Sequence, residues 1–335
     1  MLDFDKEIAP IGGWLTKNEG IFGMFQLIWK RATFLYLLST EFSGTSQKFY
    51  FKNEDGLKLC GILTKPEKET DNCIILCHGI TVDKEEDGIF TELAQKLAKV
   101  GFAVFRFDFR GHGESEGKSI DMTVTGEERD LEATIRFLQD FGYTNFGVLG
   151  ASFAGGAVSL FVVRHQNIVK ALILWNAIID YHSLLEPELP WPKKYFGEEQ
   201  MKKLEKQGFI EIGSSKFKIG KNLFVELRKL RQWKELQKLK VPILFVHGDK
   251  DTYVPFEDSV KYSKLLKTAK LETIQGAEHG FHDNKKQEEQ ADKVTVEFFL
   301  KNLAPLGGLQ IYRNVIRNQK SVFRKKMSAH KTQQL

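Results

Sequence analysis

The fold of this 335-residue chain is decided by the stretch FGVLGASFAG, residues 146–155. Its apolar first half predicts a buried strand, and the small residues around Ser152 predict a sharp turn from that strand into a helix. Such a turn holds the serine hydroxyl out on a tight bend, and small neighbours let backbone and substrate come close. Ala154 stands where the usual pattern has glycine, and Gly155 follows it. The stretch predicts a nucleophilic serine.

Two further loops follow predicted strands and carry side chains that can assist a serine. VPILFVHGDKD (241–251) predicts a buried strand and an acidic loop, and LETIQGAEHGF (271–281) predicts a strand and a loop with a histidine. Open α/β sheets place their sites just past the carboxyl ends of strands. The chain order serine, carboxylate, histidine belongs to one serine hydrolase fold and differs from the orders of the others.

An activated serine requires these three residue types. Ser152 is a poor nucleophile until a base removes its proton, and the imidazole of His279 can take and return that proton near neutral pH. A buried carboxylate, from Asp249 or Asp251, fixes the tautomer of the imidazole. His282 is the alternative base. We assign Ser152 as nucleophile, His279 as base and Asp251 as the orienting acid.

A fourth segment, CIILCHGI (73–80), predicts an apolar strand that ends in His-Gly-Ile. Backbone amides just after such a strand can point at a substrate oxygen, and so can the amide that follows the nucleophile. We therefore expect the amides of Ile80 and Phe153 to form an oxyanion hole.

The middle of the chain alternates between strand and helix patterns, which predicts an α/β fold with a mostly parallel sheet covered by helices on both faces. Strands are predicted near residues 46–53, 57–65, 73–78, 102–108, 145–150, 169–175, 242–247 and 269–275. Helices are predicted near residues 86–100, 124–141, 152–165, 256–267 and 287–303.

Over residues 45–303 the chain resembles the α/β-hydrolase superfamily, in particular bacterial cinnamoyl/feruloyl esterases and monoacylglycerol lipase-like and serine aminopeptidase-like hydrolases. The resemblance implies an eight-stranded α/β-hydrolase fold with a cap insertion, and a metal-free ester hydrolase without a cofactor. It also favours the second aspartate of the acidic loop, Asp251, as the acid. The motifs that carry it are His78-Gly79, DFRGHGES (108–115), the Ser152 turn, GDKD (248–251) with Val254-Pro255, and GAEH (276–279).

Several polar residues near these motifs have structural interpretations. The block at 108–115 is expected to be a turn after a strand, with Asp108 and Arg110 paired. His78, His112 and His247 are expected to hold loops near the site.

Other function classes are disfavoured. The glycines at 111, 113 and 117 are one residue too widely spaced for a dinucleotide fingerprint. There is no Walker loop, and no His/Cys cluster has zinc spacing. No recognised nucleic-acid module accompanies the basic residues, so no nucleic-acid partner is expected. Three cysteines, two of them on one predicted strand, argue for a reducing, cytoplasmic compartment.

Residues 176–240 interrupt the alternation of strand and helix. This insertion carries aromatic residues and prolines, including Trp191 and Tyr195. In the superfamily that the chain resembles, an insertion here is a cap over the site, and caps select substrate. We expect the segment 175–224 to supply an apolar acyl or aryl pocket.

The two ends differ from the rest. Residues 1–44 predict an apolar helical extension that either packs on the core or the tail or docks on a membrane. Lys30-Arg31 interrupts its apolar runs, and it resembles neither a signal peptide nor a spanning helix. The last 35 residues hold eight Lys or Arg and no Asp or Glu. Residues 304–335 therefore predict a basic amphipathic tail that either packs on the core or contacts an anionic membrane, at the inner membrane surface.

The sequence as a whole predicts a serine carboxylic ester hydrolase that works through an acyl-enzyme on a small-molecule ester. A thioesterase or a small peptide/amide hydrolase would use the same three residues. A non-catalytic, membrane-associated binding module is the alternative from another class. The oligomeric state is not predicted.

Overall fold

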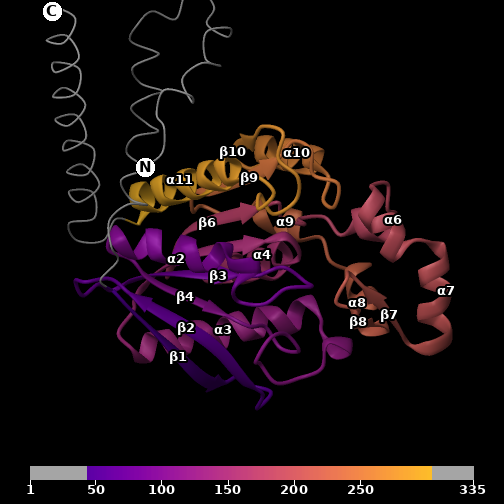
Figure 1. Cartoon of the computed structure of the whole chain (residues 1–335), viewed down its shortest axis with the longest axis horizontal. Coiled ribbons are helices and arrows are strands. Elements are labelled where there is room, and N and C mark those ends of the chain that lie inside the picture. Colours follow the sequence, from indigo (N-terminus) through magenta and orange to yellow (C-terminus); the bar gives the residue numbers. More distant parts are fainter. Residues whose placement is uncertain (1–43, 304–335) are drawn as a thin grey trace, which may run out of the picture. The chain divides into compact units, whose positions relative to one another are not determined.

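The computed structural model describes residues 44–303, and eight strands in this range form one sheet (Figure 1). Their order is β1-β2-β4-β3-β5-β6-β9-β10; β2 runs antiparallel to both of its neighbours and the other pairs are parallel. The predicted mostly parallel sheet of the α/β-hydrolase fold is confirmed, and each strand lies within one residue of its predicted bounds. The strands are β1 (Thr45–Lys52), β2 (Lys58–Lys65), β3 (Asn72–Cys77), β4 (Ala103–Phe107), β5 (Asn145–Ala151), β6 (Val169–Trp175), β9 (Ile243–Gly248) and β10 (Ala269–Ile274).

Helices cover both faces of the sheet, as alternation along β5 shows. Residues 147 and 150 point to opposite faces because side chains alternate along a strand. A Cβ at Gly147 would lie 2.6 Å from Phe299 of α11, and one at Gly150 would lie 2.5 Å from Val158 of α4. One layer therefore holds α2 and α11, and the other holds α3, α4, α9 and α10. These helices are α2 (Ile89–Lys99), α3 (Val124–Asp140), α4 (Gly155–Arg164), α9 (Gln232–Leu236), α10 (Phe256–Leu265) and α11 (Lys285–Asn302).

The elements inserted between β6 and α9 form a separate group beyond the end of the sheet, at the right of Figure 1. They contain a two-stranded antiparallel hairpin, and a second apolar cluster joins them to Phe153 and Ile80 beside the sheet. We propose that this group is the predicted cap. Its elements are α5 (His182–Leu185), α6 (Pro190–Phe196), α7 (Glu198–Gln207), β7 (Phe209–Ile212), β8 (Phe217–Gly220) and α8 (Lys221–Leu227).

The predicted pairing of Asp108 with Arg110 is wrong. Asp108 is fully buried and binds the ammonium of Lys84 at 2.9 Å, whereas Arg110 binds Asp130 at 2.7 Å and Asp55 at 2.8 Å. The parallel pairing of β3 with β4 brings the loops after these strands together, and so gives Asp108 a partner 24 residues away. A buried carboxylate needs an opposite charge close in space, and the nearest arginine in the sequence did not identify that partner.

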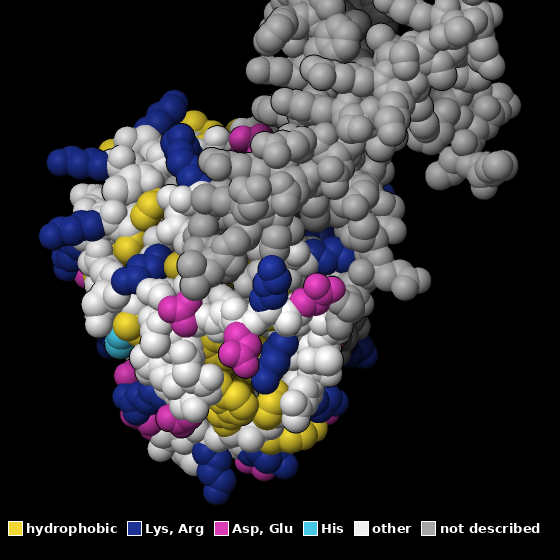
Figure 2. Space-filling view, turned by 90° about the vertical axis from the view of Figure 1, so that its left-hand side faces the viewer, with side chains coloured by type: hydrophobic (Ala, Val, Ile, Leu, Met, Phe, Trp, Pro, Cys, Tyr) yellow, Lys and Arg dark blue, Asp and Glu magenta, His cyan; other side chains and the backbone are white. Residues whose placement is uncertain are grey.

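The face of the described domain seen in Figure 2 mixes charges of both signs, with small apolar patches between them. None of the helices within residues 44–303 is long and apolar enough to cross a membrane. The extensions predicted at 1–44 and 304–335 lie outside the described residues, apart from Gly44.

Candidate active site

Ser152 occupies the sharp turn that the sequence predicts. β5 ends at Ala151 and α4 begins at Gly155, and Ser152 between them has φ of +49°. A non-glycine residue in this region is strained, and such strain persists only where the surroundings hold it. The Ser152 carbonyl accepts the amide of Ile178 at 2.9 Å, which ties the turn to the segment after β6. The turn presents the hydroxyl at the carboxyl end of the sheet.

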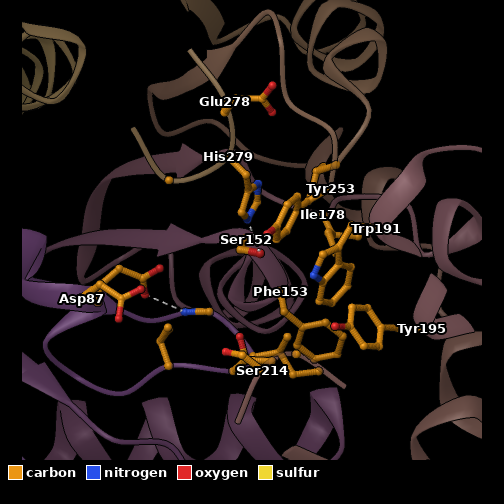
Figure 3. A pocket seen from close by; sticks show the side chains of 18 of the residues that line it. Asp87, Ser152, Phe153, Ile178, Trp191, Tyr195, Ser214, Tyr253, Glu278 and His279 are labelled. Atoms are coloured by element: carbon orange, nitrogen blue, oxygen red, sulfur yellow. Dashed lines mark hydrogen bonds between the residues drawn. The ribbon is translucent and has the colours of Figure 1, made fainter. Parts of the chain in front are cut away.

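His279 lies between Ser152 and Asp251 and contacts both. Its Nε2 is 3.0 Å from Ser152 Oγ, and its Nδ1 is 2.7 Å from Asp251 Oδ2. In Figure 3 the imidazole points directly at the serine. The three residues come from the ends of β5, β9 and β10, so the parallel register brings them together.

Asp251 accepts four hydrogen bonds. Its Oδ1 takes the backbone amides of Tyr253 at 2.7 Å and Val254 at 2.8 Å. Its Oδ2 takes His279 and, at 3.1 Å, Nε2 of the buried His247. From the sequence, His247 was expected only to hold a loop. The spacing of four residues between His247 and Asp251, across a tight turn, could have predicted this contact.

The electrostatics of this group favour a charged acid and a basic imidazole. Burial raises the pKa of the Asp251 carboxyl, but the charge of His279 and the hydrogen bonds from His247 and His279 outweigh burial and hold the pKa far below its usual range. Burial lowers the pKa of His279, and Asp251 outweighs it, so the pKa stands above 6.5. Such opposed shifts suit a base that is oriented by an ionised carboxylate.

The alternative acid, Asp249, and the alternative base, His282, do not take part in these hydrogen bonds. Asp249 Oδ1 accepts the backbone amide of Gly276 at 2.6 Å and has no contact with His279. His282 is exposed and lines the same cavity, but its Nε2 lies 3.5 Å from Asp283 and it has no hydrogen bond to Ser152 within the described residues. Within residues 44–303, Ser152 therefore has His279 as its imidazole partner.

The loop after β3 is held by two histidines. His78 Nε2 accepts the amide of Phe109 at 3.1 Å, so Nδ1 carries the proton and donates to the Gly79 carbonyl at 2.7 Å. His112 Nε2 lies 2.8 Å from the Ile80 carbonyl. These contacts fix the peptide planes on both sides of Ile80, and its amide has no acceptor within the described residues. The expectation that His78 and His112 hold loops agrees with these contacts.

A cavity of about 750 Å³ opens above Ser152 and is large enough for a small ester. One wall is a stack of rings: Tyr253 lies parallel to His279 at 4.7 Å, and Trp191 of α6 lies parallel to Tyr253 at 4.9 Å. Tyr195 packs on Trp191 at 4.9 Å. Figure 3 shows this aromatic side across Ser152 from Asp87.

Glu86, which no sequence motif indicates, also lines the cavity. Its Oε2 accepts the amide of Gly79 at 2.8 Å. Burial raises the pKa of Glu86 to about 7, against the lowering effects of that hydrogen bond and of His279. The residue has φ of +46°, a conformation that no local sequence pattern indicates for glutamate.

One group of described residues has the donor atoms of a cation site. The ligand atoms of Cys60, Asp108 and Glu114 lie within 4.8 Å of one another. The ammonium of Lys84 lies between the carboxylates, 2.9 Å from Asp108 and 3.0 Å from Glu114, and satisfies them as a cation would. This cluster stabilises the loop after β4 and lies apart from Ser152.

Comparison with known proteins agrees with this geometry. Residues 68–207 match the model of the serine aminopeptidase family S33, and residues 226–304 match the dienelactone hydrolase family. A monoacylglycerol lipase of Mycolicibacterium smegmatis is 24% identical over 290 residues, 76% of this chain and 97% of that protein. A bifunctional esterase/perhydrolase of Acinetobacter calcoaceticus is 28% identical over 220 residues, 54% of this chain and 76% of that protein.

Solved structures show the same similarity. Est1E from Butyrivibrio proteoclasticus, determined with ferulic acid bound, superposes with a TM-score of 0.65 at 26% identity, covering 76% of this chain and 99% of that one. The esterase domain of a Rhodothermus marinus protein shares the fold, with a TM-score of 0.60 at 21% identity over 77% and 99% of the two chains. The chain therefore has the α/β-hydrolase fold, and these similarities indicate a serine hydrolase of esterase or lipase type.

Proposed function

We propose that the chain hydrolyses carboxylic esters through an acyl-enzyme, with Ser152 as nucleophile, His279 as base and Asp251 as the orienting acid. The observation that carries the proposal is the position of His279, 3.0 Å from Ser152 Oγ and 2.7 Å from Asp251, below a cavity of about 750 Å³. A serine becomes nucleophilic only when a base is aligned in this way.

The contacts support the following sequence of steps. Ser152 Oγ attacks the ester carbonyl while its proton passes to His279 Nε2, and the negative oxygen accepts the amides of Ile80 and Phe153. The tetrahedral intermediate then collapses, and His279 returns the proton to the departing alcohol. A water molecule repeats the attack on the acyl-enzyme, giving up its proton to His279, and releases the carboxylic acid and free Ser152.

The cap, predicted at residues 176–240, supports a substrate with an apolar acyl or aryl group. Trp191 and Tyr195 lie on one side of Ser152, where they would contact the acyl chain. The relatives are named for monoacylglycerol, for esters and, in Est1E, for bound ferulic acid, all of which combine a carbonyl with an apolar group. We propose the same class of small-molecule ester here.

Hydrolysis of p-nitrophenyl esters from acetate to octanoate tests the assignment. We expect wild type to be active and Ser152→Ala to be inactive. Ser214→Ala is the matched control, because Ser214 lines the same cavity from the β7–β8 turn and has no imidazole partner among the described residues. Full activity of Ser152→Ala, or no hydrolysis by wild type across the series, would refute the proposal.

The alternative substrates use the same chemistry. Matched thioester and anilide probes in the same assay distinguish an esterase from a thioesterase or an amide hydrolase by their relative kcat/KM. A non-catalytic binding module is disfavoured by the alignment of Ser152, His279 and Asp251, because mere binding does not require an activated serine.

The proposed membrane contact rests on the sequence of residues 304–335, which lie outside the described residues. Co-sedimentation of full-length and tail-deleted protein with anionic vesicles tests it, and equal, negligible binding would refute it. A cytoplasmic location is likewise a proposal. Its support is that Cys60, Cys73 and Cys77 are free and buried.

A further inference from the structure

One oxygen of the Glu86 carboxylate has no partner and borders the space beside the nucleophile. Oε2 is used by the amide of Gly79, whereas Oε1 has no hydrogen bond within the described residues. A methyl group placed on Gly79 would lie 3.3 Å from Ser152 Cβ and 3.5 Å from Glu86 Oε1. The free oxygen and the serine therefore flank the same small region of the cavity.

The backbone holds this carboxylate in place. Glu86 and Asp87 have φ of +46° and +53°, and Gly88 follows at +95°. A non-glycine residue in this conformation is strained, so packing around the turn must hold it. The Gly79 amide also anchors the side chain by its hydrogen bond to Oε2. The backbone turn and this hydrogen bond together fix the position of Oε1.

The charges around the cavity favour a cation on this side. Glu86 and the neighbouring Asp87 line it, and Lys194 is the one ammonium among the lining residues. Lys194 lies over the ring of Tyr195, 5.0 Å from its centroid, and so belongs to the aromatic side. Glu86 carries the cost of partial burial without a compensating cation, which a bound ammonium would supply.

An ester that reacts at Ser152 has two sides, and the cavity offers a different surface to each. The aromatic rings lie across Ser152 from Asp87 (Figure 3) and suit the acyl group. With the acyl group on the side of the rings, the opposite side, next to Glu86 and Asp87, remains for the alcohol. We propose, resting on the proposed esterase function, that Glu86 binds a positively charged alcohol moiety and that amino-alcohol esters are preferred substrates.

A matched pair of esters tests the charge preference. Butyrylcholine and 3,3-dimethylbutyl butyrate have the same shape, and the second replaces the ammonium nitrogen with carbon. At pH 8, where Glu86 is ionised, we expect wild type to prefer the cation by about tenfold in kcat/KM, the scale of one partly screened charge pair. The preference should fall to near unity in Glu86→Gln, whose amide oxygen can still accept the Gly79 amide.

Glu278→Gln is the control, because it makes the same chemical change at a carboxylate that Thr252 already binds at 3.1 Å. The ratio of the two esters should stay at the wild-type value in this variant. A wild-type ratio at or below unity, or a ratio that Glu86→Gln leaves unchanged, would overturn the inference. Because the readout is a ratio, a general loss of activity in a variant does not affect it.

Calorimetric titration with choline alone measures the same subsite without turnover. We expect binding to wild type and to Glu278→Gln, and loss of binding in Glu86→Gln. Absence of choline binding to wild type would overturn the inference even if neutral esters are hydrolysed. Conversely, choline binding by a protein that hydrolyses neither ester would refute the proposed esterase and leave the cation site supported.

Discussion

The four hydrogen bonds to Asp251 predict the outcome of one substitution, Asp251→Asn. Oδ1 accepts two backbone amides, those of Tyr253 at 2.7 Å and Val254 at 2.8 Å. Both donors are fixed, so the amide oxygen of the asparagine must take this position. Its NH2 group then occupies the Oδ2 position, where it faces Nδ1 of His279 and Nε2 of His247.

The consequence is a wrong tautomer of the base. His279 Nδ1 must accept a hydrogen bond from the amide, so the proton moves to Nε2, which can then no longer take the proton of Ser152. In a serine protease the corresponding substitution lowers kcat by about 10⁴, or about 5.4 kcal/mol in activation free energy. We expect a loss of this size for p-nitrophenyl butyrate at pH 8, with KM changed by less than about threefold.

Asp249→Asn is the matched control two residues away. Asp249 accepts only the Gly276 amide, and an asparagine oxygen can keep that bond. We expect kcat within about threefold of wild type, since the substitution removes one partly exposed charge. The reasoning fails if correctly folded Asp251→Asn, checked by circular dichroism, keeps more than about a hundredth of wild-type kcat, or if Asp249→Asn loses as much.

Three further outcomes are expected. Because Asp251 raises the pKa of His279 above 6.5 and catalysis needs the neutral imidazole, kcat/KM should fall as the pH drops through a pKa above 6.5; a pH–rate profile that stays flat down to pH 6 contradicts this. Gly156→Ala would place Cβ 1.9 Å from the Tyr181 hydroxyl and should destabilise the fold by about 1–3 kcal/mol in urea unfolding. Trp191→Ala should raise KM for octanoate about tenfold and leave KM for acetate nearly unchanged, and parallel increases would argue against an acyl wall.

Patterns that depend on neighbours in the chain predicted most of the fold. The strands lie within one residue of expectation because apolar runs bounded by helical periodicity are local signals. The grouping of Ser152, Asp251 and His279 followed from the same signals. Each residue comes just after a strand, and adjacent parallel strands bring their carboxyl ends to one edge.

What the sequence could not predict depends on contacts across the fold. Asp108 was expected to pair with the nearest arginine. It is fully buried and forms an ion pair with Lys84, which lies in the loop after a different strand. Glu86 is turned toward Ser152 by a left-handed turn that only packing can impose. His247 reaches Asp251 because both lie in one tight turn around the end of β9.

The site has two parts, the residues at the strand ends and the side chains contributed by the proposed cap, and we expect them to differ in their tolerance of substitutions. Ser152, His279 and Asp251 follow strand ends, where a shift in any one strand would break at least one of the two hydrogen bonds of His279. The proposed cap reaches the base through stacked rings, from Trp191 to Tyr253 to His279. Its other contacts include cavity-lining side chains and hydrogen bonds from the start of α3 to Glu226. Substitutions in the cap can therefore alter which ester is held without disturbing proton transfer. This explains in physical terms how relatives of about 25% identity can share one sheet and carry different substrate names.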